Sequence, residues 1–235
     1  MASSEKDDEK TNLFPIILNM TTKTNAIFAT AYFPPITYMA KLGEYQSVII
    51  EQYETYPKQT YRNRAVIATA MGSMSLSVPV VKRNGNHTIT KDIDICNHEN
   101  WRIKHCRAIE AAYNSSPYFM YYKDDIFHIL NQDYSTLPEL NIAILRFLAK
   151  KLHIKTEIRL SVDFVFSHDL PADTDDYRNY FSPKTTDNSI SSLPVYDQVF
   201  ADRVGFLPNA SILDLLFNMG PEANQYLKVV SKLSL

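Results

Sequence analysis

Two short apolar runs with two adjacent prolines between them constrain the fold of this chain more than any other feature. The runs cover residues 26–31 and 47–50, and the β-branched side chains of the second favour a strand buried on both faces. Pro34 and Pro35 end the first strand, because proline has no N–H to donate to a sheet. Residues 36–42, between the prolines and the second apolar run, suit a short helix. We therefore predict a strand, loop, helix, strand unit that begins an α/β fold.

The rest of the chain continues this alternation of helices and strands. Residues 64–69 and 75–81 have the pattern of two paired strands joined across Gly72, which predicts an inserted β-hairpin. Further along, we predict helices at 101–113 (with Asn100 as its N-cap), 141–152 and 209–218, a strand at 156–161, and a long loop at 168–194. The expected fold is a Rossmann-like layered sheet with flanking helices and the hairpin inserted.

Length, charge and cysteine content limit the class of protein. The 235 residues predict one α/β domain over 26–235, preceded by a polar N-terminal extension over 1–25. No apolar run approaches the roughly 20 residues of a membrane span, and no signal-peptide pattern is present, so we expect a cytoplasmic protein with no integral membrane segment. A net charge of −2 does not favour nucleic acid as a partner. Two cysteines, Cys96 and Cys106, make a zinc ribbon or a disulfide framework unexpected.

Polar side chains gather after the second predicted strand. Glu51 and Gln52 follow the strand directly, where open α/β sheets place ligand-binding groups, and Arg62, Asn63 and Arg64 come ten residues later. Glu51 could serve as a general base or form a salt bridge to one of the arginines. The two guanidiniums could hold a phosphate or carboxylate, or one of them could brace an acid of the preceding loop. We therefore predict Glu51 as catalytic and the other four residues as substrate-binding.

Aromatic residues and one histidine complete the candidate site. Tyr32 and Tyr38 flank the two prolines and could stack a base or a sugar ring, or simply pack the turn. Trp101 and His105 lie one turn apart on a predicted helix, so they share a face. His105 is the second catalytic candidate, as an acid or base, although a helical histidine is more often structural. Neither a glycine-rich phosphate loop nor metal-ligand spacing is present, so we predict no metal and name no cofactor.

Five ordered motifs carry a resemblance to a known family. They are YFPPITY, EQYETYPKQTYRNR, SLSVPVVK, WRIKHCRAIEAAYNSSPYF and SILDLLFNMG, and they extend over nearly the whole chain from about residue 27 to residue 220. Together they resemble the WbqC-like family of bacterial proteins. The resemblance implies a setting near the biosynthesis of O-antigen and other surface polysaccharides, but it does not imply a particular reaction.

Two functions are compatible with these observations. One is a transferase acting on a nucleotide-linked sugar, with Arg62 and Arg64 on phosphate, Glu51 or His105 as base and Tyr32 against the ring. The other is a non-catalytic binding or scaffold protein of cell-envelope biogenesis. If the site binds a ligand, changing Arg62 or Glu51 to alanine should weaken binding at a stability cost of no more than about 1 kcal/mol. The sequence does not predict an oligomeric state.

Overall fold

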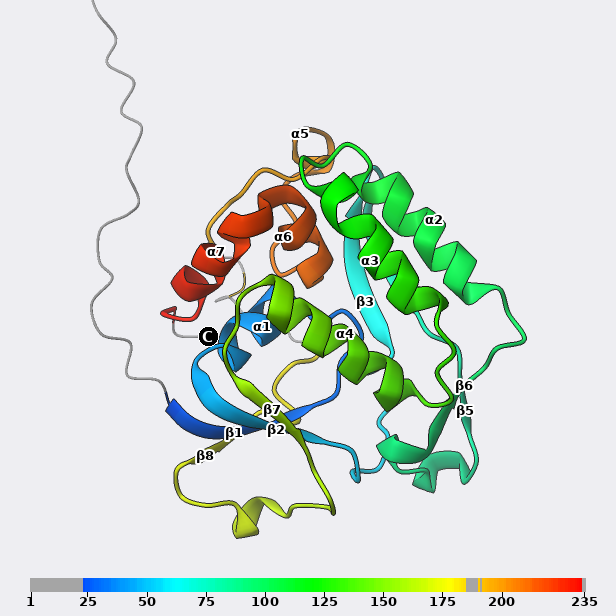
Figure 1. Ribbon diagram of the computed structural model, residues 1–235, viewed down its shortest axis with the longest axis vertical. Helices are drawn as coiled ribbons and strands as arrows, with labels where there is room; N and C mark the ends of the chain where they lie inside the picture. Colours follow the sequence, from blue (N-terminus) through cyan, green and yellow to red (C-terminus); the bar gives the residue numbers. More distant parts are fainter. Residues whose placement is uncertain (1–22, 185–189, 191, 234–235) are drawn as a thin grey trace, which may run out of the picture.

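A four-stranded parallel sheet is the central element of the computed structural model, which describes residues 23–184, 190 and 192–233. Its strand order is β7 (Glu157–Leu160), β2 (Tyr45–Glu51), β1 (Lys23–Ala29) and β8 (Thr174–Asp176). In Figure 1 the helices lie above this sheet and the connection from β7 to β8 hangs below it. A parallel sheet flanked by helices confirms the predicted α/β class.

The first unit of the sheet is the predicted strand, loop, helix, strand unit. Helix α1 (Ile36–Leu42) has the predicted bounds. β2 extends beyond its apolar run at both ends, whereas β1 begins three residues before its run and ends two residues before the end of that run. The parallel register pairs Ala26 with Val48 and Ala29 with Glu51. Because the two strands end together, Glu51 lies at the carboxyl edge of the sheet, where the chain leaves β2.

Two small antiparallel strand pairs follow. β3 (Arg64–Thr69) has the predicted bounds and pairs with β4 (Gly72–Ser77), which confirms the hairpin. The prediction of one continuous strand over 75–81 was wrong. The chain leaves the hairpin at Pro79, which has no N–H for a ladder, and then forms β5 (Val80–Lys82), which pairs with β6 (Ile93–Ile95).

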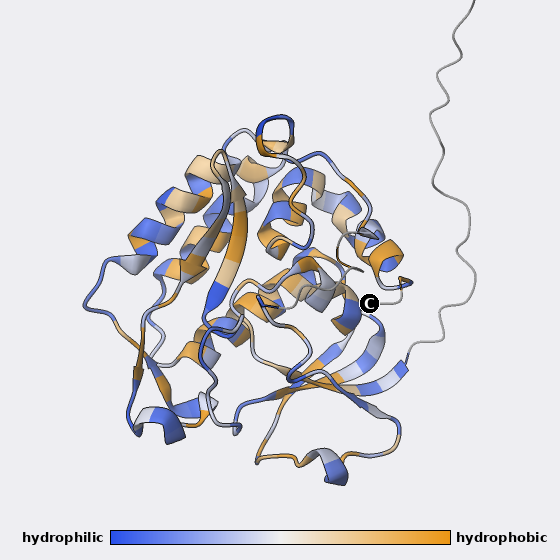
Figure 2. Ribbon diagram, turned by 180° about the vertical axis from the view of Figure 1, so that it is seen from behind, coloured by the Kyte–Doolittle hydropathy of each residue, from blue (hydrophilic) through white to orange (hydrophobic). Residues whose placement is uncertain are grey.

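The helices form the layer above the sheet. They are α2 (Trp101–Tyr113), α3 (Phe119–Asn131), α4 (Leu137–Lys151), α5 (Ala201–Val204), α6 (Ile212–Met219) and α7 (Ala223–Val230). Single 3₁₀ turns occur at Gly85–His87, Thr90–Asp92, Ser167–Asp169 and Gly220–Glu222. Hydrophilic and hydrophobic residues alternate around these helices in Figure 2, as expected for helices with one buried face.

Helix ends were predicted unevenly. α2 has the predicted bounds and Asn100 at its N-cap position, but the Asn100 side chain makes no capping hydrogen bond. α4 begins four residues earlier than predicted, because Thr136 and Glu139 form a capping box and Pro138 occupies the first turn. The sequence analysis did not predict α3 or α7.

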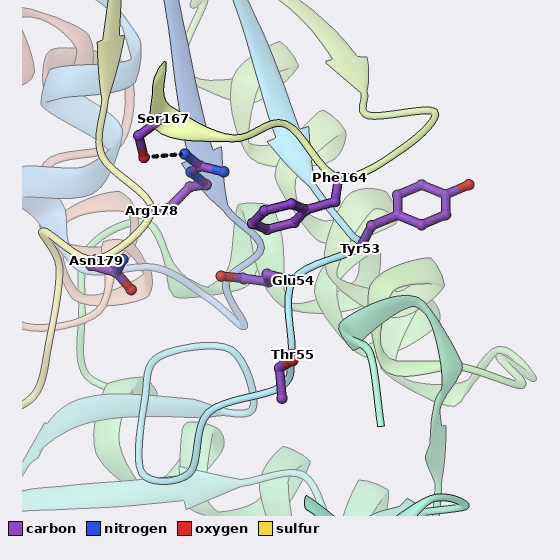
Figure 3. Close-up of a pocket in the computed structure, with 7 residues that line it drawn as sticks. All are labelled: Tyr53, Glu54, Thr55, Phe164, Ser167, Arg178 and Asn179. Carbon is purple, nitrogen blue, oxygen red and sulfur yellow. Dashed lines mark hydrogen bonds between the residues drawn. The ribbon is translucent and has the colours of Figure 1, made fainter. Parts of the chain in front are cut away.

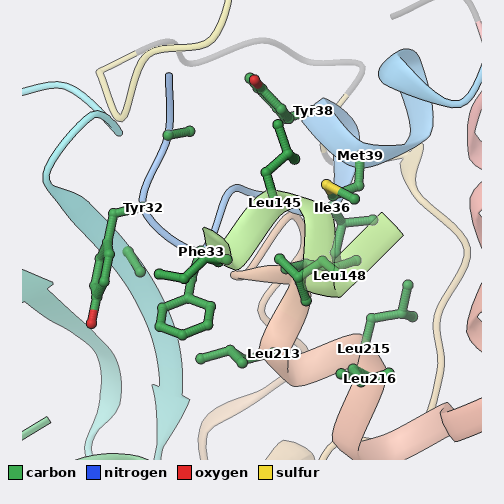
Figure 4. Packing of buried hydrophobic residues seen from close by; sticks show 14 of the residues in the cluster. Tyr32, Phe33, Ile36, Tyr38, Met39, Leu145, Leu148, Leu213, Leu215 and Leu216 are labelled. Atoms are coloured by element: carbon green, nitrogen blue, oxygen red, sulfur yellow. The ribbon is translucent and has the colours of Figure 1, made fainter. Parts of the chain in front are cut away.

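The core lies between the sheet and the helices. It joins aromatic and aliphatic side chains from elements far apart in the sequence, as Figure 4 shows for Tyr32 and Phe33, for Ile36 and Met39 of α1, for Leu145 and Leu148 of α4, and for Leu213, Leu215 and Leu216 of α6. Each fully buried side chain of this kind contributes about 1.5–3 kcal/mol. The core therefore fixes the end of β1 and the start of α1 beside α4 and α6.

One acid, Asp214, is buried inside this helical layer and is 1% exposed. Its Oδ1 accepts hydrogen bonds from the Tyr196 hydroxyl at 2.6 Å and from the Gln198 amide at 2.9 Å. Burial raises the pKa of this carboxyl above its usual 3.8, and the hydrogen bonds oppose that shift. Asp214 thus has a structural role, with neutral partners in place of an ion pair.

The segment predicted as a long loop at 168–194 contains a strand. β8 pairs with β1 in parallel, with Ile27 opposite Asp176, so that prediction was wrong for residues 174–176. Residues 185–189 and 191 of the same segment lie outside the described residues, as do residues 1–22 of the predicted N-terminal extension. β1 begins at Lys23, before the predicted end of that extension.

No described helix combines the length and the apolar composition that crossing a membrane requires.

Candidate functional site

A pocket of about 410 Å³ opens at the carboxyl ends of the parallel strands. Its lining residues come from three segments: Tyr53, Glu54 and Thr55 after β2, Phe164 and Ser167 after β7, and Arg178 and Asn179 after β8. Figure 3 shows the Glu54 carboxylate and the Phe164 ring directed into the space beside Arg178. This is the edge at which open parallel sheets bind ligands.

Glu51 ties two of the three segments together. Its Oε1 accepts hydrogen bonds from the backbone N–H groups of Gln52 at 2.9 Å and Tyr53 at 2.7 Å, and from the Ser161 hydroxyl at 2.9 Å. Its Oε2 accepts from the Val165 N–H at 3.3 Å. The side chain is 0% exposed and does not line the pocket. In this structure Glu51 therefore fixes the chain after β2 to the chain after β7.

Arg178 joins the third segment to these two. Its guanidinium donates to both carboxylate oxygens of Asp176, at 2.9 and 2.5 Å, to the Ser167 hydroxyl at 2.9 Å and to the Val165 carbonyl. The same group lies 3.6 Å from Glu51 Oε2. The Asp176 carboxylate raises the pKa of Arg178, which stays charged. The positive charge at the pocket wall is thus held by two acids and cannot swing freely toward a ligand.

Glu54 is the carboxylate that faces the pocket. Arg62 holds it with two hydrogen bonds of 2.7 Å each, and the two side chains are almost fully buried, at 9% and 3% exposed. Arg62 also donates to the Arg178 carbonyl at 3.2 Å. Burial raises the pKa of Glu54 above its usual 4.5, and the charge of Arg62 opposes this shift without cancelling it. Of the alternatives open in the sequence, Arg62 takes the one that braces an acid of the preceding loop.

Two of the other residues predicted to bind substrate after β2 make side-chain contacts to the backbone. The Gln52 amide donates to the Ser161 carbonyl at 3.3 Å, and the Asn63 amide donates to the Val78 carbonyl at 2.9 Å. Arg64 lies half-buried at the start of β3. None of the three lines the pocket, and their binding role stays a prediction.

Tyr38 does not line the pocket described above. Its hydroxyl donates to the Ala29 carbonyl at 2.8 Å, and the side chain is 2% exposed. Together with Tyr61 and Phe181 it lines a void of about 10 Å³ beside Arg62. Such a void has room for about one water molecule, and the binding role of Tyr38 stays a prediction.

The second catalytic candidate, His105, belongs to a separate buried cluster. Its Nδ1 shares a 2.8 Å hydrogen bond with the Tyr32 hydroxyl, and the Trp101 ring meets it edge-on at 5.1 Å. The shared helical face of Trp101 and His105 is as predicted. However, none of the three side chains lines the pocket, and all are at most 6% exposed. Their roles in binding and catalysis stay predictions, and the geometry favours packing between β1 and α2.

The buried histidine gives a pH-dependent prediction. Burial lowers the pKa of His105 from 6.5 to about 4, so the unfolded chain binds this proton at a higher pH than the folded chain does. The contribution of His105 to stability is therefore complete above pH 6.5 and is lost as the pH falls to about 4. From this shift, the free energy of unfolding should drop by about 3 kcal/mol over that range.

Urea unfolding between pH 4 and pH 7.5 would measure this drop, with His105→Gln and the exposed His98→Gln as a matched pair. We expect the His105 variant to lose most of the extra pH dependence and the His98 variant to keep it. A His105 ring that titrates near 6.5 by NMR would contradict the assignment.

Most of the pocket wall was missed by the sequence analysis. Tyr53, Glu54 and Thr55 lie within the motif EQYETYPKQTYRNR, but Phe164 and Ser167 follow a strand that was predicted without a site at its end. Arg178 and Asn179 follow a strand that was not predicted. A usable signal was present inside the predicted loop, where Asp175, Asp176 and Arg178 lie within four consecutive residues. A cluster of charged residues at one place in a loop is typical of the end of a strand that carries a site.

No three His, Cys, Asp or Glu side chains in the described part of the chain are grouped so that they could hold a metal ion.

Comparison with known proteins places the chain in a family. A model of the WbqC-like protein family matches residues 30–174, which contain β2, the hairpin, helices α1 to α4 and the start of β8. The chain belongs to the WbqC-like family. The uncharacterized protein Rv1507c of Mycobacterium tuberculosis (strain ATCC 25618 / H37Rv) is 27% identical over 227 residues, covering 88% of this chain and 98% of that protein. No solved structure matches the chain significantly.

The family match includes part of the pocket. Five of the seven lining residues, from Tyr53 to Ser167, fall inside the matched range, whereas Arg178 and Asn179 lie just beyond it. The hydrogen bonds that Glu51 accepts from the segments after β2 and β7 also fall inside the matched range. The match confirms the resemblance stated from the five motifs.

Proposed function

We propose that this WbqC-like protein is a transferase-type enzyme that binds a nucleotide-linked sugar in the pocket after β2, β7 and β8, in the biosynthesis of bacterial O-antigen or another surface polysaccharide. The surface-polysaccharide setting rests on what membership of the family implies. The kind of reaction rests on the pocket, which combines hydroxyl, amide and carboxylate groups with two aromatic rings. Such a mixture suits a hydroxyl-rich ligand with an apolar ring face.

The Glu54 carboxylate is the observation that carries this proposal. It is the acid directed into the pocket, and its raised pKa makes it a stronger base than an exposed glutamate. A general base at this point can accept the proton of an acceptor hydroxyl as the new bond to the transferred sugar forms. Arg62 then acts as a positioning residue, since its two hydrogen bonds fix the plane of the carboxylate.

The neighbouring groups have matching roles in the proposal. Thr55 and Asn179 supply hydrogen-bonding groups on either side of Glu54, and the Phe164 ring lies 5.6 Å from the Arg178 guanidinium, which holds it at the pocket wall. Glu51 keeps the segments after β2 and β7 together. The base role predicted for Glu51 thus moves by three residues to the acid that a substrate can reach.

The experiment is a ligand screen followed by one isosteric change. Thermal unfolding of the wild-type protein is measured with uridine-, guanosine- and thymidine-diphosphate sugars, and the compound that raises the melting temperature is used in a transfer assay. Ligand at 100 times its dissociation constant should stabilise the protein by about 2.7 kcal/mol. Glu54→Gln should lower the transfer rate by about 10²–10⁴-fold and leave the stabilisation by the ligand nearly unchanged.

Glu157→Gln is the matched control, because Glu157 is an exposed glutamate at the other end of β7. It should keep the full transfer rate. The proposal fails if no nucleotide-linked sugar stabilises the wild-type protein, or if Glu54→Gln transfers sugar as fast as the control.

A second candidate function is a binding or scaffold protein, which the segment after β7 favours. Val162 is 90% exposed and Phe166 is 53% exposed, so this segment presents apolar side chains beside the pocket. A partner that co-purifies in a fixed ratio, together with no stabilisation by any nucleotide-linked sugar, would favour this function over the transferase.

A further inference from the structure

The order of the parallel strands reverses at β1. The chain runs from β1 to β2 and β7 on one side and then returns to β8 on the other side of β1. In open α/β sheets, ligands bind in the crevice outside the carboxyl ends of the strands at such a reversal. The pocket proposed for the sugar lies after β2, β7 and β8, so the crevice between β1 and β8 has no role in that proposal.

A second cavity lies in this crevice. It is the void of about 10 Å³ beside Arg62, and its lining includes Ala29 at the end of β1 and Phe181 after β8. Arg178 lines both cavities. The ion pair of Glu54 and Arg62 also joins them, because Glu54 lines the first cavity and Arg62 lines the second. The two cavities are therefore neighbours, and one ligand can extend from the first into the second.

The void is small because an aromatic ring of the chain itself occupies the crevice. The Phe181 ring is stacked on Phe28 of β1, with a centroid distance of 6.0 Å and an interplanar angle of 10°. Its centre lies 5.2 Å from that of Tyr38 of α1 and 6.1 Å from that of Tyr177, which follows β8. Three elements thus supply three rings around a fourth, at spacings typical of aromatic pairs.

Phe181 is the least restrained ring of this group. Phe28 and Tyr38 are buried, and the Tyr38 hydroxyl donates to a backbone carbonyl of β1. The Tyr177 hydroxyl accepts a hydrogen bond from Tyr45 at 3.0 Å. Phe181 is only partly buried, and its side chain has no polar group that could fix it. Rotation of this side chain toward water would leave room for one planar ring between walls that stay in place.

From this arrangement we infer a nucleobase subsite between the carboxyl ends of β1 and β8, in which the planar base of the ligand takes the place of the Phe181 ring. The inference deepens the proposed function and rests on it for the identity of the ligand, whose sugar lies beside Glu54. The incoming base regains the ring contacts that Phe181 gives up. The Tyr38 hydroxyl lines the void and keeps a lone pair that can accept a hydrogen bond from the base.

The test uses uridine, guanosine and thymidine diphosphates, each titrated into the full chain by isothermal titration calorimetry. Phe181→Ala should bind at least one of them about tenfold more tightly than the wild type does, because binding no longer requires displacement of the ring. Inorganic pyrophosphate, which has no base, should bind the two proteins alike. Phe127→Ala is the matched control, since Phe127 is a partly buried ring on α3 that lines neither cavity, and it should leave the affinity unchanged.

A fluorescent variant reports the displacement of the ring directly. In Phe181→Trp an indole replaces the phenyl ring, and its emission should shift to the red when a nucleoside diphosphate moves it into water. The single native tryptophan, Trp101, is buried in the separate cluster with His105, so the emission of the wild type should stay constant. If Phe181→Ala does not fold, this measurement decides.

The outcomes separate the subsite from the function proposed for the pocket. Tighter binding to Phe181→Ala, in a protein whose wild type transfers no sugar, supports the subsite and overturns the transferase. Transfer of a sugar from a nucleotide that leaves the Phe181→Trp emission unchanged overturns the subsite alone. The subsite is also overturned if no nucleoside diphosphate binds the wild type or Phe181→Ala, or if Phe127→Ala gains the same affinity.

Discussion

Arg62→Ala should destabilise the protein by about 3–5 kcal/mol, the range for removing one partner of a buried ion pair. The change leaves the Glu54 carboxylate 9% exposed with no cation at hydrogen-bonding distance, and it also removes the bond to the Arg178 carbonyl. The free energy of unfolding in urea is the measurement. Burial of an uncompensated charge, rather than the loss of attraction, supplies most of this cost.

Arg83→Ala is the control that separates the effect of burial from the effect of losing an ion pair. Arg83 also holds a carboxylate with two hydrogen bonds, but its side chain is 69% exposed, so its removal should cost no more than about 1 kcal/mol. A double variant, Arg62→Met with Glu54→Leu, should recover part of the loss because it removes both charges. An Arg62→Ala protein as stable as Arg83→Ala would show that water reaches Glu54 and that the pair is not buried in solution.

This expectation reverses the one drawn from the sequence. The sequence alone allowed two roles for Arg62: binding a phosphate of the ligand or bracing a nearby acid. The expectation that Arg62→Ala is tolerated followed from the first role. The choice depends on the course of the chain between Glu54 and Arg62, which includes Gln59 with a left-handed φ of 59°. A non-glycine residue in that conformation is set by the surrounding structure and has no reliable local signal.

Elements with strong local signals were predicted with their observed bounds. Helix α1 follows two prolines that fix its start, α2 combines good helix formers with apolar residues one turn apart, and β3 is a β-branched and apolar run. In each case the information lies within about ten residues. The α/β class then follows, because these elements alternate along the chain.

Elements that depend on distant partners were missed. β8 consists of Thr174, Asp175 and Asp176, of which only the threonine favours a strand, and it exists because β1 offers an unpaired edge about 150 residues earlier in the chain. Two lining residues of the pocket follow β8 directly. The site could therefore be predicted on the β2 side, where acids follow an apolar run, but not on the side that a non-local strand pairing creates.

The shared face of Trp101 and His105 shows the same limit. The helical spacing correctly predicted that the two rings contact each other. It did not predict which other residues surround them. His105 reaches Tyr32, 73 residues earlier, and the pair is enclosed by the core. Helical periodicity indicates which residues lie together on one element, whereas access to a ligand depends on the packing of the other elements around it.

Glu51→Ala should also destabilise the protein by about 3–5 kcal/mol, because each buried donor left without an acceptor costs about 1–3 kcal/mol. The change deprives three donors of this acceptor, namely the N–H groups of Tyr53 and Val165 and the hydroxyl of Ser161, whereas the Gln52 N–H keeps its hydrogen bond to Ser161 Oγ at 3.0 Å. Glu51→Gln keeps one acceptor oxygen and should lose less. Urea unfolding measures both, with the exposed Glu157→Ala as the control.

The loss of stability in Glu51→Ala should appear first in the segments that Glu51 holds and only later in the whole domain. This order distinguishes a positioning role for Glu51 from a general packing role. Without Glu51 the segments after β2 and β7 are no longer held to each other, so amide exchange at Tyr53 and Val165 should accelerate under conditions in which β1 and α4 remain protected. Ligand binding in the pocket should fall in parallel, since Tyr53 and Phe164 belong to those segments. Uniform acceleration over the whole chain would mean that Glu51 supports the core of the sheet and not the pocket. An unchanged exchange rate at Val165 would contradict its hydrogen bond to Glu51 and leave the base role first predicted for Glu51 as the better explanation of its place at the end of β2.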